Sequence, residues 1–217
     1  MTSYTTENYL KTIYHLSQQS KEVYMTDVAK SLGVSMPTVN SMIKKLSENK
    51  LLKYEKYKPL QLTKKGNLDA AMIVRKHRLI EMFLVKFMDF GWEQVHEVAE
   101  QMEHINSALF FEKLDKMLGY PQTDPHGSPI PDKNGSMIKL NLVALSKCQP
   151  KQTVVLKALL DTSTEFINYL NSKGLALGSR LKIKKIEPFD KTICLVCNKQ
   201  TLIFTDAVSK KILVEVF

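Results

Sequence analysis

A short acidic segment near the middle of the chain carries the residue types that bind metal ions. The stretch VHEVAEQMEHI, residues 95–105, contains five of them: His96, Glu97, Glu100, Glu103 and His104. No Lys or Arg lies between positions 87 and 112, although the 217-residue chain has 31 of them and a formal charge of +9. Carboxylates crowded together in this way repel one another. A divalent cation would supply the missing positive charge.

The spacing of these residues places them on one side of a helix. Successive helical residues turn by about 100°, so the five polar groups share one arc and the apolar Val98 and Met102 lie on the opposite one. His77 and Glu81 form a second pair one turn apart, so two helices can face a common ion. Imidazole and carboxylate together suit first-row divalent metals. The alternative is a solvated polar face, but the absence of nearby Lys and Arg favours metal.

Hydrophobic periodicity predicts the elements that position these groups. We expect helices over residues 9–17, 23–32 (with Thr26 as N-cap), from Ser35 or Met36 onward, and over 67–87, 92–106 and 108–118. A Pro/Gly-rich loop follows at 119–135. From position 152, five short strands and a helix at 163–174 predict an SH3-like β-barrel. The fold class is mainly α with a small β part: a winged helix-turn-helix domain at 1–66, a helical dimerisation domain with its linker at 67–149, and the SH3-like domain at 150–217.

The N-terminal domain has the pattern of a DNA reader. Two helices, a turn at Gly33, a third helix and a hairpin over 52–62 describe a winged helix-turn-helix. Residues 1–86 contain 15 Lys and Arg against 7 Asp and Glu. Hydroxyls and amides can contact base edges, while lysines suit phosphates; the alternative is a solvated helix beside a wing that only packs. The expected DNA contacts are Ser35, Pro37, Thr38, Asn40, Ser41, Lys44 and Lys45 on the third helix, with Tyr57 and Lys58 on the wing.

Other features of the sequence indicate the oligomeric state and the localisation of the protein. Aromatic residues between positions 83 and 111 exceed what a small core needs, which suggests a homodimer interface. No apolar run is long enough to cross a membrane, the first residues lack a secretion signal, and three cysteines are few, so we expect a cytoplasmic protein without membrane contact. Cys194 and Cys197 resemble half of a zinc site, but a second pair is missing. No phosphate loop or nucleophile elbow is present.

Four segments resemble the diphtheria toxin repressor family of metal-dependent regulators: LQLTKKG, VRKHRLIEMFL, EQMEHINS and DPHGSPIP. The resemblance covers nearly the whole chain and implies a C-terminal domain of the FeoA type. Iron-type members carry Cys at the position of Glu100 and Met at that of Asn8. Manganese-type members match Glu100, but have Asp in place of Asn8 and can have Glu in place of Lys11. Carboxylate and amide donors make the site harder, which favours Mn(II). The resemblance assigns a primary site to Asn8, His77, Glu100, Glu103 and His104.

The family also has an ancillary metal site, for which two ligand sets match this sequence. One set is Glu81, Asp124, His126 and Asp161. The other is His77, Glu81 and His96 with Glu165. Both depend on Glu81, and the sequence does not choose between them. His126 alone could equally be an ordinary loop histidine.

These features together predict a homodimeric, metal-activated repressor that senses Mn(II), binds a double-stranded operator and controls metal-uptake genes; it is not an enzyme. An ion held by Asn8 and by the acidic helix would fix the DNA-binding domain against the dimerisation domain. Three alternatives stay open. The first is an Fe(II)-responsive repressor, the second a metallohydrolase acting on nucleic acid, and the third a metal-independent DNA-binding protein, because Asn8 and Lys11 depart from the manganese-type pattern.

Overall fold

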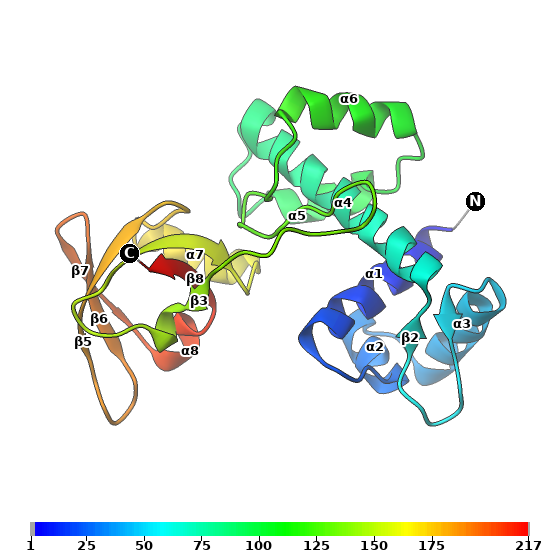
Figure 1. Ribbon diagram of the computed structural model, residues 1–217, viewed down its shortest axis with the longest axis horizontal. Coiled ribbons are helices and arrows are strands. Elements are labelled where there is room, and N and C mark those ends of the chain that lie inside the picture. The colour runs from blue at the N-terminus through cyan, green and yellow to red at the C-terminus, as the bar shows by residue number, and fades with distance from the viewer. Residues whose placement is uncertain (1–2, 217) are drawn as a thin grey trace. The chain divides into compact units, whose positions relative to one another are not determined.

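The computed structural model describes residues 3–216, which divide into two compact units (Figure 1). The first unit contains the residues up to His77, together with Glu100–Lys113 and Pro131–Met137. The second contains Arg78–Ala99, Leu114–Ile130 and the residues from Ile138 onward. Among the described residues, no helix is both long and apolar enough to cross a membrane.

The first unit begins with the expected winged helix-turn-helix, in which α1, α2 and α3 are grouped around a short hairpin (Figure 1). Leu52 pairs with Leu62 in the hairpin, as predicted. Gly33 ends α2 with a φ of 64°, the left-handed conformation that glycine adopts without strain. The elements are α1 (Tyr4–Gln19), α2 (Met25–Leu32), α3 (Met36–Glu48), β1 (Leu52–Lys53) and β2 (Gln61–Leu62).

Capping residues explain where these helices start. The Ser3 side chain accepts a hydrogen bond from the Thr6 amide, so α1 begins five residues earlier than its apolar stripe predicts. Ser35 caps α3 in the same way. The predicted cap of α2 at Thr26 is wrong, because the N-cap is Tyr24. The Tyr24 amide donates to the Asp27 carboxylate at 2.8 Å, which fixes the first turn.

One apolar core joins these helices to the start of α4 (Lys64–Met88). Leu10 of α1, Val28 of α2 and Ile43 of α3 are fully buried, and Ala70 and Val74 of α4 lie in the same cluster. The long helix therefore starts as part of the core of the winged helix-turn-helix. It is also longer than the predicted 67–87.

The acidic helix is shorter than the sequence suggests. We expected it over 92–106, but α5 spans Val95–Met102 and is followed by a turn. Glu103 and His104 therefore lie just beyond the helix, where the chain turns toward α6 (Ala108–Leu118). The Ser107 side chain accepts from the Phe110 amide, which favours the start of a separate helix, α6, at this point.

The second unit contains the SH3-like domain as a six-stranded antiparallel sheet of order β3-β8-β4-β5-β6-β7. In residues 3–216 no strand pairing links β7 to β3, so the barrel is not closed. Three elements of only two to four residues each, β3, η1 and α8, were not predicted from the sequence. The elements are β3 (Val143–Ala144), η1 (Leu145–Lys147), β4 (Thr153–Leu159), α7 (Thr164–Ser172), β5 (Arg180–Ile186), β6 (Ile193–Cys197), β7 (Gln200–Phe204), α8 (Asp206–Ser209) and β8 (Ile212–Val216).

Alternating burial along the strands builds a core that is separate from the core of the first unit. On β6, Ile193, Leu195 and Cys197 point inward, while Cys194 is only half-buried. The two cysteines of CLVC thus lie on opposite faces of the strand, and both are free thiols. They do not form half of a zinc site.

A glycine in the LTKKG segment provides a test of how tightly α4 packs on the hairpin. A Cβ at Gly66 would lie 1.9 Å from the Leu51 carbonyl oxygen, which already accepts from the Thr63 amide. Gly66→Ala should therefore lower the free energy of unfolding by roughly 2–4 kcal/mol. Urea denaturation followed by circular dichroism measures it. Gly33→Ala is the control: its Cβ meets nothing within 4 Å, so only backbone strain of about 1 kcal/mol applies. Equal losses in the two variants would contradict this packing.

Candidate metal centre

A buried carboxylate is the centre of the predicted primary site. Glu103 is fully buried, with no exposed surface. Its Oε1 lies 2.7 Å from the Nζ of Lys11 on α1, and its Oε2 lies 2.6 Å from the Nδ1 of His77 on α4. Residues from three separate segments thus meet at one carboxylate. The ligand atoms of His77, Glu100 and Glu103 all lie within 4.8 Å of one another, which a single ion can bridge.

Lys11 supplies a positive charge that the sequence around Glu103 lacks. Its Nζ lies 2.5 Å from Glu100 Oε1 as well as 2.7 Å from Glu103 Oε1, and its side chain is only 11% exposed. No Lys or Arg lies near these carboxylates along the segment, but the folded chain does bring one to them. The compensating group comes from α1, about 90 positions earlier in the chain. The residues of the acidic segment alone therefore could not indicate it.

A second pair of side chains borders the same cluster. His104 Nδ1 lies 2.6 Å from Glu7 Oε2 of α1, and the Tyr4 ring lies against the imidazole with a centroid distance of 3.6 Å. The Tyr4 hydroxyl donates to the Gln101 carbonyl at 2.9 Å. Glu7 was not predicted to take part in this site. The available signal was its position next to Asn8, a predicted ligand.

Two buried polar atoms of the predicted ligands have no hydrogen-bond partner. They are Asn8 Oδ1 and His104 Nε2; the latter lies 3.7 Å from Glu103 Oε1. Leaving such an atom buried and unsatisfied costs about 1–3 kcal/mol. A metal ion would satisfy both, since an amide oxygen and an imidazole nitrogen are ordinary ligands. The donor set therefore fits a first-row divalent ion.

A second cluster lies within the other unit and contains Glu81, Asp124 and His126, all buried, with ligand atoms within 4.8 Å of one another. Asp124 Oδ1 accepts from the amides of His126 and Ser128, and Arg78 Nε lies 3.3 Å from Asp124 Oδ2. Burial, together with the nearby Glu81 carboxylate, raises the pKa of Asp124 despite Arg78. A cation in this cluster would relieve the repulsion between the two carboxylates.

The imidazole of His126 is oriented as a metal ligand would be. Its Nε2 lies 2.7 Å from the Trp92 carbonyl oxygen, and its ring stacks on the Trp92 ring. Because a carbonyl can only accept, Nε2 carries a proton, and Nδ1 is the ring nitrogen that could bind an ion. Nδ1 lies 3.9 Å from Glu81 Oε2.

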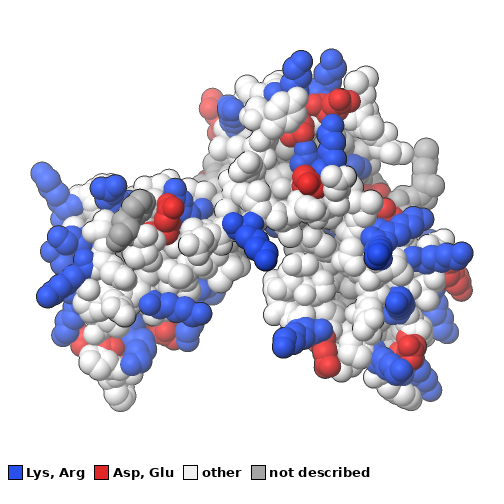
Figure 2. All heavy atoms as spheres, viewed as in Figure 1, with Lys and Arg blue, Asp and Glu red and all other residues white. Residues whose placement is uncertain are grey.

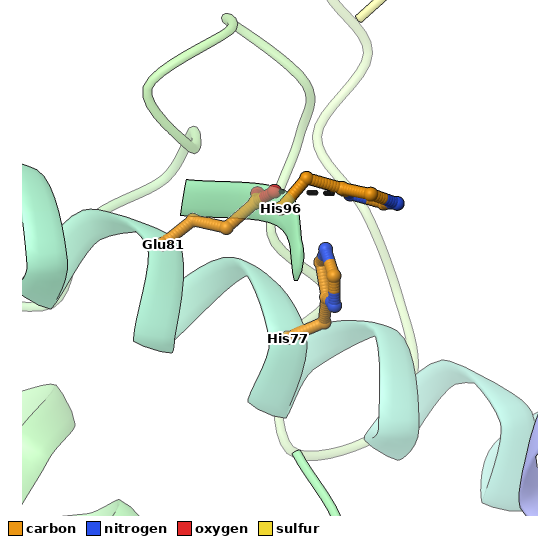
Figure 3. A group of neighbouring side chains, drawn as sticks. All are labelled: His77, Glu81 and His96. Carbon is orange, nitrogen blue, oxygen red and sulfur yellow. Dashed lines mark ion pairs between the residues drawn. The ribbon is translucent and has the colours of Figure 1, made fainter. Parts of the chain in front are cut away.

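The other ancillary ligand set also includes Glu81 (Figure 3). Glu81 Oε1 lies 3.6 Å from His96 Nδ1, and His77 lies one turn earlier than Glu81 on the continuous helix α4. Among the described residues, the fourth member of each set is not part of a group of close ligand atoms. Asp161 pairs with Lys211 at 2.6 Å, and Glu165 is exposed in the first turn of α7.

The predicted DNA contacts lie on the surface of the first unit, where Lys and Arg side chains are visible (Figure 2). Asn40 is half-buried; the other eight are exposed, and Tyr57 is 85% exposed. A hollow of about 690 Å³ between α3 and the wing is lined by Asn40, Lys44, Tyr57 and Lys58 among others. Ser35 and Thr38 share a 2.8 Å hydrogen bond that caps α3, so their hydroxyls are already partly used.

Three family models match the chain. Residues 1–60 match the iron dependent repressor N-terminal DNA binding domain, and residues 63–132 match the iron dependent repressor metal binding and dimerisation domain. Residues 143–216 match the FeoA domain.

Similar proteins agree with these models. The chain is 32% identical over 192 residues to the iron-dependent repressor IdeR of Mycobacterium leprae, covering 83% of this chain and 84% of that one. It is 26% identical over 189 residues to the diphtheria toxin repressor of Corynebacterium diphtheriae, covering 82% and 84%. A manganese-dependent transcriptional repressor in complex with manganese superposes with a TM-score of 0.87 at 30% identity, covering 98% of this chain and 100% of that one. The manganese regulator SloR gives 0.77 at 32% identity, covering 98% of each.

The winged helix, the helical segment with its histidines and carboxylates, and the FeoA domain define a metal-dependent transcriptional repressor. The chain belongs to the iron-dependent repressor family, which includes the diphtheria toxin repressor, so the resemblance noted in the sequence is confirmed. It is a regulator and not an enzyme, which excludes the metallohydrolase alternative.

The buried ion pairs around Glu103 can be tested without metal. In EDTA, Glu103→Ala should lower the free energy of unfolding by about 3 kcal/mol, because it removes the buried carboxylate that contacts both His77 and Lys11. Urea denaturation measures the loss. Glu100→Ala is the matched control, since its side chain is 34% exposed and should cost less. If the two variants lose the same stability, Glu103 is not the centre of this cluster.

Proposed function

We propose that the chain is a homodimeric repressor whose operator binding is activated by Mn(II) held by Asn8, His77, Glu100, Glu103 and His104. The observation that carries the proposal is the meeting of α1, α4 and the turn after α5 at the buried Glu103 carboxylate. Two further predicted ligands, Asn8 and His104, present buried atoms without hydrogen-bond partners. As a DNA-binding regulator, the protein would act in the cytoplasm and control metal-uptake genes.

Linkage between the winged helix and the metal-binding segment supplies the mechanism. Asn8 belongs to α1, within the DNA-binding module, whereas Glu103 and His104 follow α5. An ion held by both restricts their relative orientation. In a dimer, two α3 helices held about one DNA turn apart can enter successive major grooves. Without the ion, the population competent to bind DNA falls and the apparent affinity falls with it.

The ligand types favour Mn(II). An amide oxygen, two carboxylates and two imidazoles form a hard donor set without sulfur. Fe(II) accepts the same donors, and an Fe(II)-responsive repressor is the alternative. Similar structures include a manganese-dependent repressor with manganese, while similar sequences are named iron-dependent repressors. A titration with both ions distinguishes the Mn(II)-activated repressor from the Fe(II)-responsive one.

We further propose that Glu81, Asp124 and His126 form the ancillary site. Their burial and the orientation of His126 favour this set over the one with His96, whose side chain is 54% exposed. Asp161 and Glu165 stay predictions as additional ligands.

The dimer and the domain limits also belong to the proposal. Exposed apolar side chains near the ends of α4 and on α6 support a subunit interface; Phe87, Leu109 and Met117 are 49%, 64% and 50% exposed. The three domains would span 1–66, 67–149 and 150–217.

Metal dependence of DNA binding tests the central claim. A duplex selected from a random library in the presence of Mn(II) should bind the protein about 100-fold more tightly with Mn(II) than with EDTA. Fluorescence anisotropy measures the affinity, and anaerobic titrations compare Mn(II) with Fe(II). Glu103→Ala should lose both the metal dependence and the tight Mn(II) site in calorimetry. Equal DNA affinity of the wild type with ion and with chelator would instead establish the metal-independent alternative.

Contacts of α3 with the DNA backbone predict a change in salt dependence. Lys44→Ala should weaken binding to all duplexes alike and reduce the slope of log K against log salt by about 1, because one phosphate contact is lost. Anisotropy titrations at several salt concentrations give the slope. Lys133→Ala, an exposed lysine in the loop after α6, should leave the slope unchanged. An unchanged slope for Lys44→Ala would remove Lys44 from the interface.

A further inference from the structure

The acidic cluster already contains a cation of its own. We propose that the Lys11 ammonium is the resident counter-ion of this site and that a divalent metal has to displace it in order to bind. The inference rests on the proposed function in taking the cluster at Glu103 as the metal site. It adds that Lys11 sets the metal concentration at which the site fills.

The contacts of Lys11 coincide with the ligands expected for the metal. Its Nζ lies 2.5 Å from Glu100 Oε1 and 2.7 Å from Glu103 Oε1, and these are the two carboxylates that the cluster offers to an ion. Metal ions bind carboxylate oxygens at about 2.0–2.2 Å. An ion at that distance from both oxygens would occupy the space of the ammonium group, and the two positive charges would repel each other.

Glu103 has no oxygen without a partner. Oε1 accepts from Lys11 and Oε2 lies 2.6 Å from His77 Nδ1. Each carboxylate oxygen keeps a second lone pair, but an ion bound there would lie against one of these partners and, at Oε1, would be repelled by the Lys11 ammonium. His77 is itself a predicted ligand and has to stay close, whereas Lys11 has no lone pair to offer while it is charged. Lys11 is thus the group that has to leave.

Burial makes this exchange costly. The Lys11 side chain is 11% exposed and Glu103 is fully buried, so water screens the pair weakly. Lys11 is carried by α1, one turn after Glu7, which pairs with His104. In the metal-free protein, Lys11 therefore already ties α1 to the turn after α5. A metal gains only the difference between its own interaction and that of the lysine, which weakens its apparent affinity.

Removing the charge of Lys11 should strengthen metal binding. Lys11→Met keeps most of the length of the side chain and removes the ammonium. By calorimetry on the full chain without DNA, it should bind Mn(II) at least about tenfold more tightly than the wild type, equivalent to about 1.4 kcal/mol. In EDTA its Tm should be lower by about 5 °C, since the carboxylates lose their counter-ion. Mn(II) should raise the Tm of Lys11→Met more than that of the wild type.

Controls separate this effect from general damage. Lys210→Met removes the lysine of an exposed ion pair with Asp206 and should change neither Mn(II) affinity nor Tm. Lys11→Gln, which retains hydrogen-bond donors, is the second variant if Lys11→Met folds only with Mn(II) or not at all, and it should also bind Mn(II) more tightly. Adding Glu103→Ala to Lys11→Met should abolish the gain. A gain that survives this addition arises at another site and overturns the inference.

The remaining outcomes are also decisive. Unchanged or weaker Mn(II) binding in both Lys11 variants shows that the lysine does not compete with the ion, and the inference fails. The proposed function is judged separately, by metal-dependent DNA binding of the wild type. A wild type that binds DNA regardless of metal, beside a Lys11→Met variant that gains a tight Mn(II) site, would refute the proposed function and support the role of Lys11.

Discussion

The buried carboxylate of Glu103 is the constraint on which the first unit depends. Placing an ionised group where water cannot reach it costs several kcal/mol unless other charges and hydrogen bonds replace the water. Lys11 and His77 provide that replacement, from α1 and from α4, for a carboxylate that follows α5. The positions of these elements are thus coupled through one carboxylate. The apolar cores explain why each module folds, but they do not by themselves explain this coupling.

The coupling is useful because apolar packing and the polar cluster respond to different conditions. Apolar packing of α1, α2 and α3 depends on temperature and hardly on the ions present. The polar cluster depends directly on which cation occupies it. A regulator can therefore keep a stable DNA-reading module while its attachment varies with metal concentration. The sheet of the second unit has its own buried core, so it can fold without help from the polar cluster.

Sequence reasoning located the elements and the side chains whose types are distinctive. Periodicity gave the bounds of α6 correctly, and the crowding of Glu100, Glu103 and His104 identified the acidic segment. It missed Lys11 and Glu7 as members of the cluster, because packing alone brings residues about 90 positions apart together. It also extended α5 through Glu103, since the helical pattern of polar residues continues where the backbone turns. Local patterns report residue type and face, whereas charge compensation is decided in three dimensions.

Each unit contains an acidic cluster with a built-in positive charge: Lys11 beside Glu100 and Glu103, and Arg78 beside Asp124. A structural metal site does not need a built-in positive charge, because a protein with such a site folds only when its ion is bound. A sensor has to stay folded when the ion is absent, so its carboxylates need another partner in that state. Asp124 shows the limit of this compensation, since burial raises its pKa even beside Arg78. Resident cations are therefore the physical requirement for a site that must persist both empty and filled, and the metal competes with them rather than with water alone.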